Sequence, residues 1–356
     1  MTCSRPICGL ALLAISLVVG LTVSGLAPAA ETSVAIEVLD LLQIPADQRR
    51  RLDRGEIATY HVAENSEREL AVGLVVAVPA PVSQVVQYLS AAQLIAQDPS
   101  IGEFGLVPDG LSSESLVGPG LVGNERDEAL SLFEAAPGTR FNLSLSEIDA
   151  LRTARAAGGS RSGAADLASN TYRRILAQRA QSYRQRGLVG IDPYARTGGA
   201  FTAPVVDLQP AIADVERIGR TGSDFREALL RFPADQPAQI ASQVYWVKRR
   251  VQRRPHLSLL HRMVVTGGPG PMIHLERYFY VGHSFNSTQI LTGALAYQDG
   301  AMVFSTTRVS TDEVLGVGSP LKRTVARGQV RDEMRARLER LRSSISPPRP
   351  AAPESP

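Results

Sequence analysis

Between residues 243 and 345 the chain alternates short apolar runs with turn residues and ends in one amphipathic stretch. Runs rich in Val, Tyr, Phe, Thr and Leu, which are typical of β-strands, occupy residues 243–253, 257–266, 272–281, 287–297 and 301–309. Turn-forming residues separate these runs, including the hairpin pair Asp299-Gly300. Links this short exclude the crossover that parallel neighbours require, so the pattern predicts an antiparallel meander.

A long helix is predicted after the last of these strands. Ser319 suits a helix cap, and Pro320 suits the first helical position because it has no N–H to leave unpaired. Apolar residues then recur at spacings of three or four, except for one gap that contains Gly328 and Gln329, and Arg and Glu cover the opposite side. The apolar positions are Leu321, Val325, Met334, Leu338, Leu341 and Ile345. We expect this side of the helix to pack against the sheet.

The earlier part of the chain adds helices and two more strands. Strands are predicted at residues 69–78 and 139–148, which brings the count to seven, with residues 57–62 as a doubtful edge strand. Residues 101–124, rich in Gly and Pro, are expected to form a loop. The fold class is therefore α+β: a seven-stranded antiparallel sheet, a long C-terminal helix and a helical insertion.

The first 29 residues have the pattern of a secretory signal. Arg5 gives a positive start, residues 7–26 are apolar, and Ala27-Pro28-Ala29 is a small-residue cleavage site. We expect a mature chain that begins near Ala30 and is periplasmic or secreted. The alternative is an uncleaved N-terminal membrane anchor, since the apolar stretch is long for a signal.

The domain organisation follows from these elements. After the signal peptide at residues 1–29, the N-terminal helices and the first part of the sheet domain are expected at residues 30–149. The helical insertion is expected at residues 150–238, and the strand meander with the C-terminal helix at residues 239–345. Residues 346–356 are Pro-rich and are expected to be a disordered tail.

Composition narrows the chemistry. The chain has 356 residues, of which 44% are hydrophobic, and its net charge is only +3, so nothing calls for a nucleic-acid partner. Both cysteines, Cys3 and Cys8, lie in the signal, which excludes thiol catalysis and cysteine-ligated zinc for the mature chain. No cofactor is expected.

Residues 76–86, which read VAVPAPVSQVV, resemble the entry to the START-like, helix-grip superfamily, where a strand ends in an Ala-Pro step before a short helix. The order of elements is also similar: a strand, short helices, antiparallel strands and one long C-terminal helix. The resemblance implies a curved sheet that grips this helix and encloses a cavity for a hydrophobic molecule. The chain departs from it at Val86, where many relatives carry Trp, and in the insertion.

Two catalytic patterns fail on closer reading. Residues 282–286 (GHSFN) nearly match the nucleophile elbow of serine hydrolases, but Asn286 replaces the closing Gly and a strand is predicted where the elbow needs a helix. His256, His261, His274 and His283 lack metal-ligand spacing. His274 and Glu276 alternate with apolar residues on one strand, so we assign their face, together with Tyr278 and Tyr280, to solvent. No catalytic or metal-binding residue is assigned.

The opposite face of each strand supplies candidate ligand contacts. We take the more apolar alternate positions of the strands at 243–253, 257–266 and 272–281 as facing the C-terminal helix, which leaves the polar residues Arg249, His261 and Arg277 among aliphatic ones. An unpaired buried guanidinium costs roughly 3–5 kcal/mol, so acidic residues of the insertion or a ligand carboxylate or phosphate must pair with it. The alternative is a one-residue β-bulge that reverses the faces of a strand and leaves these residues exposed to solvent. The candidates are Tyr245, Arg249, His261, Met263, Arg277 and Phe279.

These observations favour an exported, non-catalytic binding protein for a hydrophobic or amphipathic small molecule, such as a lipid, with an acidic group. The basic run at residues 248–254 suggests contact with an anionic membrane surface, or else a solvated strand edge. Two alternatives stay open: an enzyme that acts on a hydrophobic substrate in the same cavity, and a cell-envelope protein whose insertion binds a protein partner. The sequence leaves the oligomeric state open.

Overall fold

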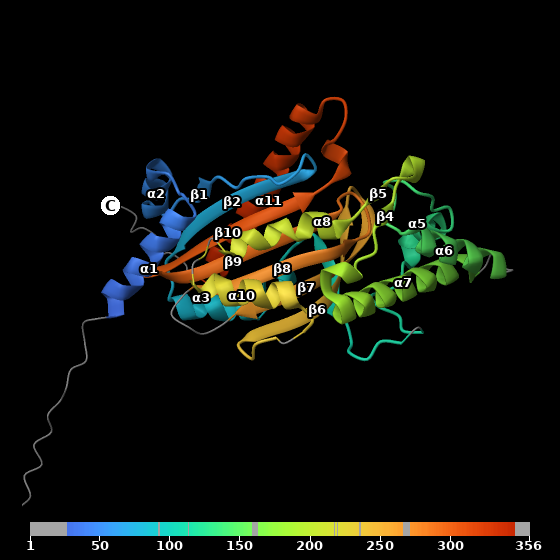
Figure 1. Cartoon of the computed structure of the whole chain (residues 1–356), viewed down its shortest axis with the longest axis horizontal. Coiled ribbons are helices and arrows are strands. Elements are labelled where there is room, and N and C mark those ends of the chain that lie inside the picture. Colours follow the sequence, from blue (N-terminus) through green and yellow to red (C-terminus); the bar gives the residue numbers. More distant parts are fainter. Residues whose placement is uncertain are drawn as a thin grey trace, which may run out of the picture.

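The computed structural model describes residues 27–91, 93–112, 114–158, 163–216, 218, 220–234, 236–265 and 271–345. An eight-stranded antiparallel sheet crosses the molecule in the order β1-β2-β10-β9-β8-β7-β6-β3 (Figure 1). The strands are β1 Ala58–Tyr60, β2 Glu69–Val78, β3 Ile101–Leu106, β6 Ile240–Val251, β7 Arg254–Val265, β8 Met272–Val281, β9 Ser287–Tyr297 and β10 Gly300–Ser310. A separate ribbon pairs β4 Tyr194–Ala195 with β5 Phe201–Thr202.

The strand count differs from the seven expected, for three reasons. The doubtful edge strand exists as β1 and pairs with β2. β3 lies in the segment expected to be a loop and pairs with β6. The strand expected at residues 139–148 is absent because α6 Leu145–Ala157 begins there: the Ser144 side chain accepts the backbone N–H of Glu147, and the Glu147 carboxylate accepts that of Ser144.

Helices cover both faces of the sheet. One face carries α3 Val82–Ser90 and α11 Ser319–Ile345, which pack on valines of β2 and β10. The other face carries the N-terminal helices and the helical insertion (Figure 1). These helices are α1 Ala27–Leu41, α2 Ala46–Asp53, α5 Arg126–Leu132, α6, α7 Ala164–Arg186, α8 Pro204–Leu208, α9 Ala213–Glu216 and α10 Arg220–Arg231, with the short α4 Gln93–Ala96 at the β3 edge.

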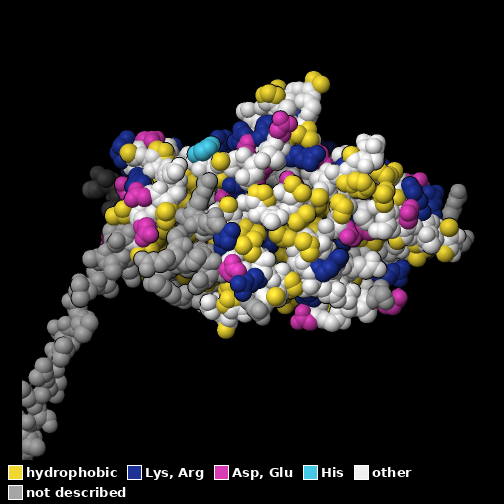
Figure 2. Space-filling view, viewed as in Figure 1, with side chains coloured by type: hydrophobic (Ala, Val, Ile, Leu, Met, Phe, Trp, Pro, Cys, Tyr) yellow, Lys and Arg dark blue, Asp and Glu magenta, His cyan; other side chains and the backbone are white. Residues whose placement is uncertain are grey.

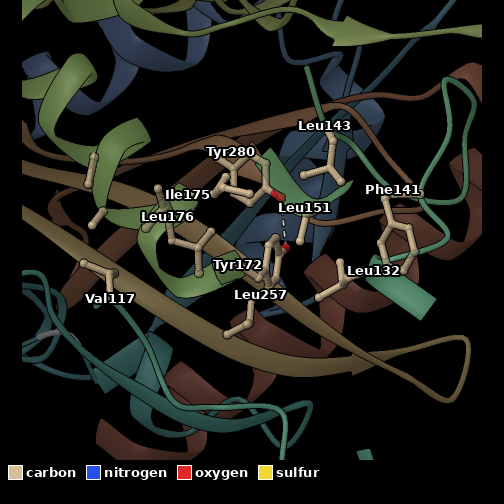
Figure 3. Packing of buried hydrophobic residues seen from close by; sticks show 14 of the residues in the cluster. Val117, Leu132, Phe141, Leu143, Leu151, Tyr172, Ile175, Leu176, Leu257 and Tyr280 are labelled. Atoms are coloured by element: carbon tan, nitrogen blue, oxygen red, sulfur yellow. Dashed lines mark hydrogen bonds between the residues drawn. The ribbon is translucent and has the colours of Figure 1, made fainter. Parts of the chain in front are cut away.

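The insertion is joined to the sheet through a buried core. Tyr172 of α7 and Tyr280 of β8 point towards each other in Figure 3, and their hydroxyl oxygens are 2.9 Å apart. Leu257 of β7 and Leu176 of α7 lie in the same cluster. Beneath the insertion, Arg179 forms an ion pair with Glu147 at 2.6 Å, and both side chains are buried. The insertion is therefore part of the main core rather than a separate lobe.

The C-terminal helix begins at Ser319, as predicted, but only its second half lies on the sheet. Met334, Leu338 and Leu341 are buried. Leu321 and Val325, expected to be buried, are 71% and 54% exposed, because the first turns of α11 extend past the end of the sheet. In Figure 1 this part projects from the top of the molecule, and Figure 2 shows apolar atoms on it.

Candidate ligand site beneath the C-terminal helix

The sheet face beneath α11 carries charged groups that are fully enclosed. Arg262 on β7 lies directly opposite Glu276 on β8, and His274 is two residues along the same strand. Arg262, His274 and Glu276 are 3%, 1% and 0% exposed. The expectation that His274, Glu276 and Tyr278 face solvent is therefore wrong. The reason is that α11, α3 and α4 cover this face, so β8 is buried on both sides.

Glu276 is held by the helix above it. An Nη of Arg337, on α11, donates to Glu276 Oε1 at 2.6 Å, and His274 Nε2 lies 3.6 Å from the same oxygen. Arg262 donates to the backbone carbonyls of Leu89 and Ser90 at the C-terminal end of α3, where free carbonyls and the helix dipole favour a cation. Charged groups from two strands and two helices therefore meet at one place.

The pKa shifts of Glu276 and His274 decide which groups of this cluster are charged at neutral pH. Burial raises the pKa of Glu276, but Arg337, His274 and Arg262 together outweigh burial and lower it below its usual range, so Glu276 is ionised. Burial lowers the pKa of His274 to about 3, against the opposing effect of Glu276, so His274 is neutral. Arg262 and Arg337 thus lie close to one fully buried carboxylate, and two further acidic groups, Glu333 and Asp98, lie nearby.

The cluster continues towards β6. The Arg249 guanidinium lies 4.9 Å from the centre of the Tyr278 ring, a cation–π contact. Tyr245 packs beside Tyr278, Leu260 and Val281 on the same face. Glu333 of α11 and Asp98, which follows α4, are the acidic groups that act on this end of the cluster.

Several buried polar atoms of this face have no hydrogen-bond partner among the described residues. They are Arg249 Nε, both ring nitrogens of His256 and of His274, Ser258 Oγ, Arg262 Nε and Glu276 Oε2. A buried polar atom without a partner costs about 1–3 kcal/mol, so native proteins almost always satisfy such atoms with protein, water or ligand. Their concentration on one face identifies it as the candidate site.

The six residues predicted from the sequence do not form one site. Tyr245 and Arg249 face α11, whereas His261, Met263, Arg277 and Phe279 face the insertion. The error comes from taking the more apolar alternate positions of each strand as facing α11, whichever side of the sheet they lie on. Gln252 and Arg253 form a two-residue turn with positive φ angles of 50° and 67°, so Val244, not Tyr245, pairs with His261.

A β-bulge adds a second change of side. Leu259 and Leu260 pair with Tyr280 and Tyr278, so Phe279 is the extra residue of β8. Phe279 and Tyr280 therefore both pack against the insertion, and Val281 lies on the α11 side with Tyr278. Tyr280, assigned by alternation to the same face as Tyr278, is on the opposite one.

Arg262, His274, Glu276 and Arg337 were missed as site residues. One signal for Arg337 is present in the sequence: it falls on the same helical stripe as Met334, Leu338 and Leu341. An arginine on a buried stripe requires a buried partner, and Glu276 is that partner. Nothing in the local pattern of β8 separates a strand buried on both faces from one with a solvated face.

Other kinds of site find little support. After the near-elbow at residues 282–286 the chain continues as β9, where a serine hydrolase requires a helix. Among the described residues, no group of three or more His, Cys, Asp or Glu side chains is placed to hold a metal ion. Within the same part of the chain, no helix combines the length and apolarity needed to cross a bilayer.

An enclosed cavity lies on the insertion side, not beneath α11. Its volume is about 10 Å³, room for roughly one water molecule. It is lined by Leu42, Tyr60, Val62, Asp214, Ile218, Leu291, Phe304 and Thr306. This cavity is too small for a lipid-sized ligand.

The chain matches no protein-family model and no curated protein. It is similar to the crystal structure of Ara h 8.0201, with 10% identity and a TM-score of 0.20, over 38% of this chain and 89% of that chain. It is also similar to the di-domain ARO/CYC StfQ from the steffimycin biosynthetic pathway, with 12% identity and a TM-score of 0.23, over 77% and 97%. At these TM-scores neither likeness carries an argument about this chain.

Proposed function

We propose that this chain is an exported protein of the START-like, helix-grip type that binds an amphipathic small molecule with an acidic group between the sheet and α11, without changing it chemically. The observation that carries the proposal is the set of unpaired buried polar atoms beneath α11, which includes the guanidinium donors Arg249 Nε and Arg262 Nε. A ligand carboxylate or phosphate supplies acceptors for these donors.

The surroundings of the cluster fit the rest of such a ligand. Val264, Met272 and Val303 of the sheet and Leu338 of α11 form an apolar core that adjoins Arg262 and His274. The acidic group would lie against Arg262 and Arg337, and the apolar part would replace contacts between α11 and the valines. Ligand sites are typically apolar with a few such polar groups.

Entry of a ligand requires α11 to move, because the helix covers the cluster. Its buried apolar contacts are those of Met334, Leu338 and Leu341. The ion pair between Arg337 and Glu276 holds the same half of the helix. The first half is held by polar contacts instead: Arg323 and Arg327 pair with Glu64, and Arg323 also donates to the carbonyl of Glu69 at the start of β2.

Binding is tested on the full chain expressed with its N-terminal segment in a bacterium. Native mass spectrometry of the exported protein is expected to show a bound molecule that organic extraction releases, and a protein mass that begins near Ala30. Protein that carries no ligand, or that keeps residues 1–29, contradicts binding or export respectively.

The site itself is tested by Arg262→Met. Titration of the extracted protein with a medium-chain fatty acid such as decanoate is expected to give a dissociation constant at least about 10-fold weaker for this variant, since one charge-assisted hydrogen bond contributes roughly 1.5–3 kcal/mol. Arg250→Met is the matched control, because Arg250 is exposed on the neighbouring β6. Equal affinity for both variants excludes the role of Arg262.

The second candidate is an enzyme that uses the same site. One observation favours it: His274 and Glu276, two groups able to transfer protons, lie 3.6 Å apart beside the cluster. An enzyme would release a product that differs in mass from the molecule supplied, and Glu276→Gln would abolish that change. A binding protein returns the molecule unchanged.

A further inference from the structure

Arg277 is buried on the face opposite the ligand site. Arg277 is 0% exposed, and on β8 it lies directly opposite His261 of β7. Aromatic rings surround this position: Tyr183 of α7 stacks on Phe279 with ring centres 3.9 Å apart, and Phe232 lies 4.4 Å from His261. A charged guanidinium is thus enclosed between the sheet and the insertion.

The hydrogen bonds of Arg277 are incomplete. Its Nε donates to Gln289 Oε1 at 3.1 Å, and Gln289 Nε2 donates in turn to the carbonyl of Ala211 at 2.8 Å. Nη1 and Nη2 make no well-aligned hydrogen bond within the described part of the chain, although the Tyr183 hydroxyl lies close enough for Arg277 to act against the effect of burial on its pKa. No ion pair with a carboxylate is present there for this arginine either.

Other buried arginines on this side of the sheet are neutralised. Arg308 binds Asp214 and Glu69 at 2.6 Å and 2.9 Å, and Arg179 binds Glu147 at 2.6 Å. Carboxylates therefore neutralise these buried guanidinium groups, whereas the described residues supply none to Arg277.

The polar neighbours of Arg277 carry no negative charge. Tyr183 Oη lies 2.7 Å from His261 Nδ1, and Ser242 Oγ lies 2.8 Å from His261 Nε2. Burial raises the pKa of Tyr183 and lowers that of His261 well below its usual value, so both are neutral. A water molecule could fill the hydrogen bonds but would leave the charge uncompensated, which costs several kcal/mol.

We propose that Arg277 holds a small inorganic anion, of the size of chloride, in an enclosed site between β8, α7 and the segment around Ala211. The unpaired Nη atoms are its donors, and the complete burial of the guanidinium limits the occupant to a small ion. The anion neutralises the buried charge and so stabilises the attachment of the insertion to the sheet. This site is separate from the ligand site and does not depend on it.

Crystals of the full chain grown in sodium bromide test the site directly. Diffraction at the bromine absorption edge is expected to give an anomalous peak in contact with Nη1 or Nη2 of Arg277. A water molecule at that position, or bromide at surface positions only, overturns the proposal.

Thermal unfolding gives an independent test in solution. Protein purified without halide is titrated with sodium chloride against sodium gluconate at equal ionic strength, and chloride is expected to raise the midpoint by about 2 °C or more. Arg277→Met is expected to lose this dependence, whereas Arg250→Met, which changes an exposed arginine, is expected to keep it. Equal midpoints of the unaltered chain in both salts overturn the proposal. If Arg277→Met does not fold, the bromide crystals decide.

Discussion

The state of Glu276 is decided by the residue opposite it on α11. Although the carboxylate is 0% exposed, its pKa is lowered, because Arg337, His274 and Arg262 together outweigh the effect of burial. A carboxyl group whose pKa is depressed in the folded state stabilises the fold above its unfolded pKa, here about 4.5, and loses this contribution as the pH falls through the folded pKa.

Glu276→Gln is expected to lower the free energy of unfolding at pH 7 by about 3–5 kcal/mol, because it leaves Arg337 covered without its partner. Urea unfolding at pH 7 and at decreasing pH measures this, and the difference from the unaltered chain should narrow below about pH 4.5. Glu339→Gln, an exposed change on the same helix, is the control. A loss no larger than in the control contradicts the pairing.

At the scale of elements, the sequence located the strands of the β6–β7 hairpin but neither their turn nor their faces. The apolar runs predicted each strand of the meander, and the break was expected at Arg254-Pro255. The turn instead uses Gln252 and Arg253, which carry no turn signal, and β7 starts at Arg254. That shift moves the pairing by two residues on each strand and so leaves every face unchanged. Arg249 and Arg277 are separated because the more apolar positions of β6 face α11, whereas those of β8 face the insertion.

The turn also carries strain that can be measured. Arg253 has φ of 67°, in the left-handed region that glycine adopts without cost. Arg253→Gly is expected to raise the free energy of unfolding by about 0.5–1 kcal/mol, as read from urea unfolding. Arg250→Gly, inside the same hairpin but in extended strand, is expected to lower it by a similar amount. Destabilisation by both changes would rule out strain at the turn.

The sequence predicted part of the candidate site but not the face of the sheet on which it lies. The sequence pointed to Arg249 and Arg277 as buried arginines that need partners, but it did not include Arg262, and the face was chosen by apolar alternation. The apolar face of β8 packs against the insertion and its more polar face lies beneath α11, and both faces are buried. The rule that the apolar face lies beneath α11 therefore assigned β8 the wrong way round. The bulge at Phe279 leaves no mark in the pattern of hydrophobic residues.

For the whole molecule, the buried histidines set the response to acid. Burial lowers the pKa of His256 and His261 well below the ordinary value, that of His274 to about 3 and that of His283 to about 4. From about pH 6.5 down to about pH 4 the unfolded chain binds protons at these positions and the folded chain does not. Stability must therefore fall as the pH falls through this range.

Each of these histidines is expected to contribute a slope of about 1.4 kcal/mol per pH unit to the free energy of unfolding. Urea unfolding from pH 7 to pH 5 measures the slope, and His274→Asn should reduce it by that amount. His61→Gln serves as control because His61 is exposed. A slope that His274→Asn leaves unchanged would show that this side chain is protonated in the fold.

Strand β8 carries buried charged residues on both of its faces. Strand alternation places His274 and Glu276 on one side and Arg277 on the other, and the extra residue at Phe279 then reverses the sides of Tyr280 and Val281. Loss or gain of one residue in the middle of this strand would turn every later side chain to the opposite face of the sheet. Insertions and deletions in natural relatives should therefore avoid residues 272–281, even where substitutions are accepted.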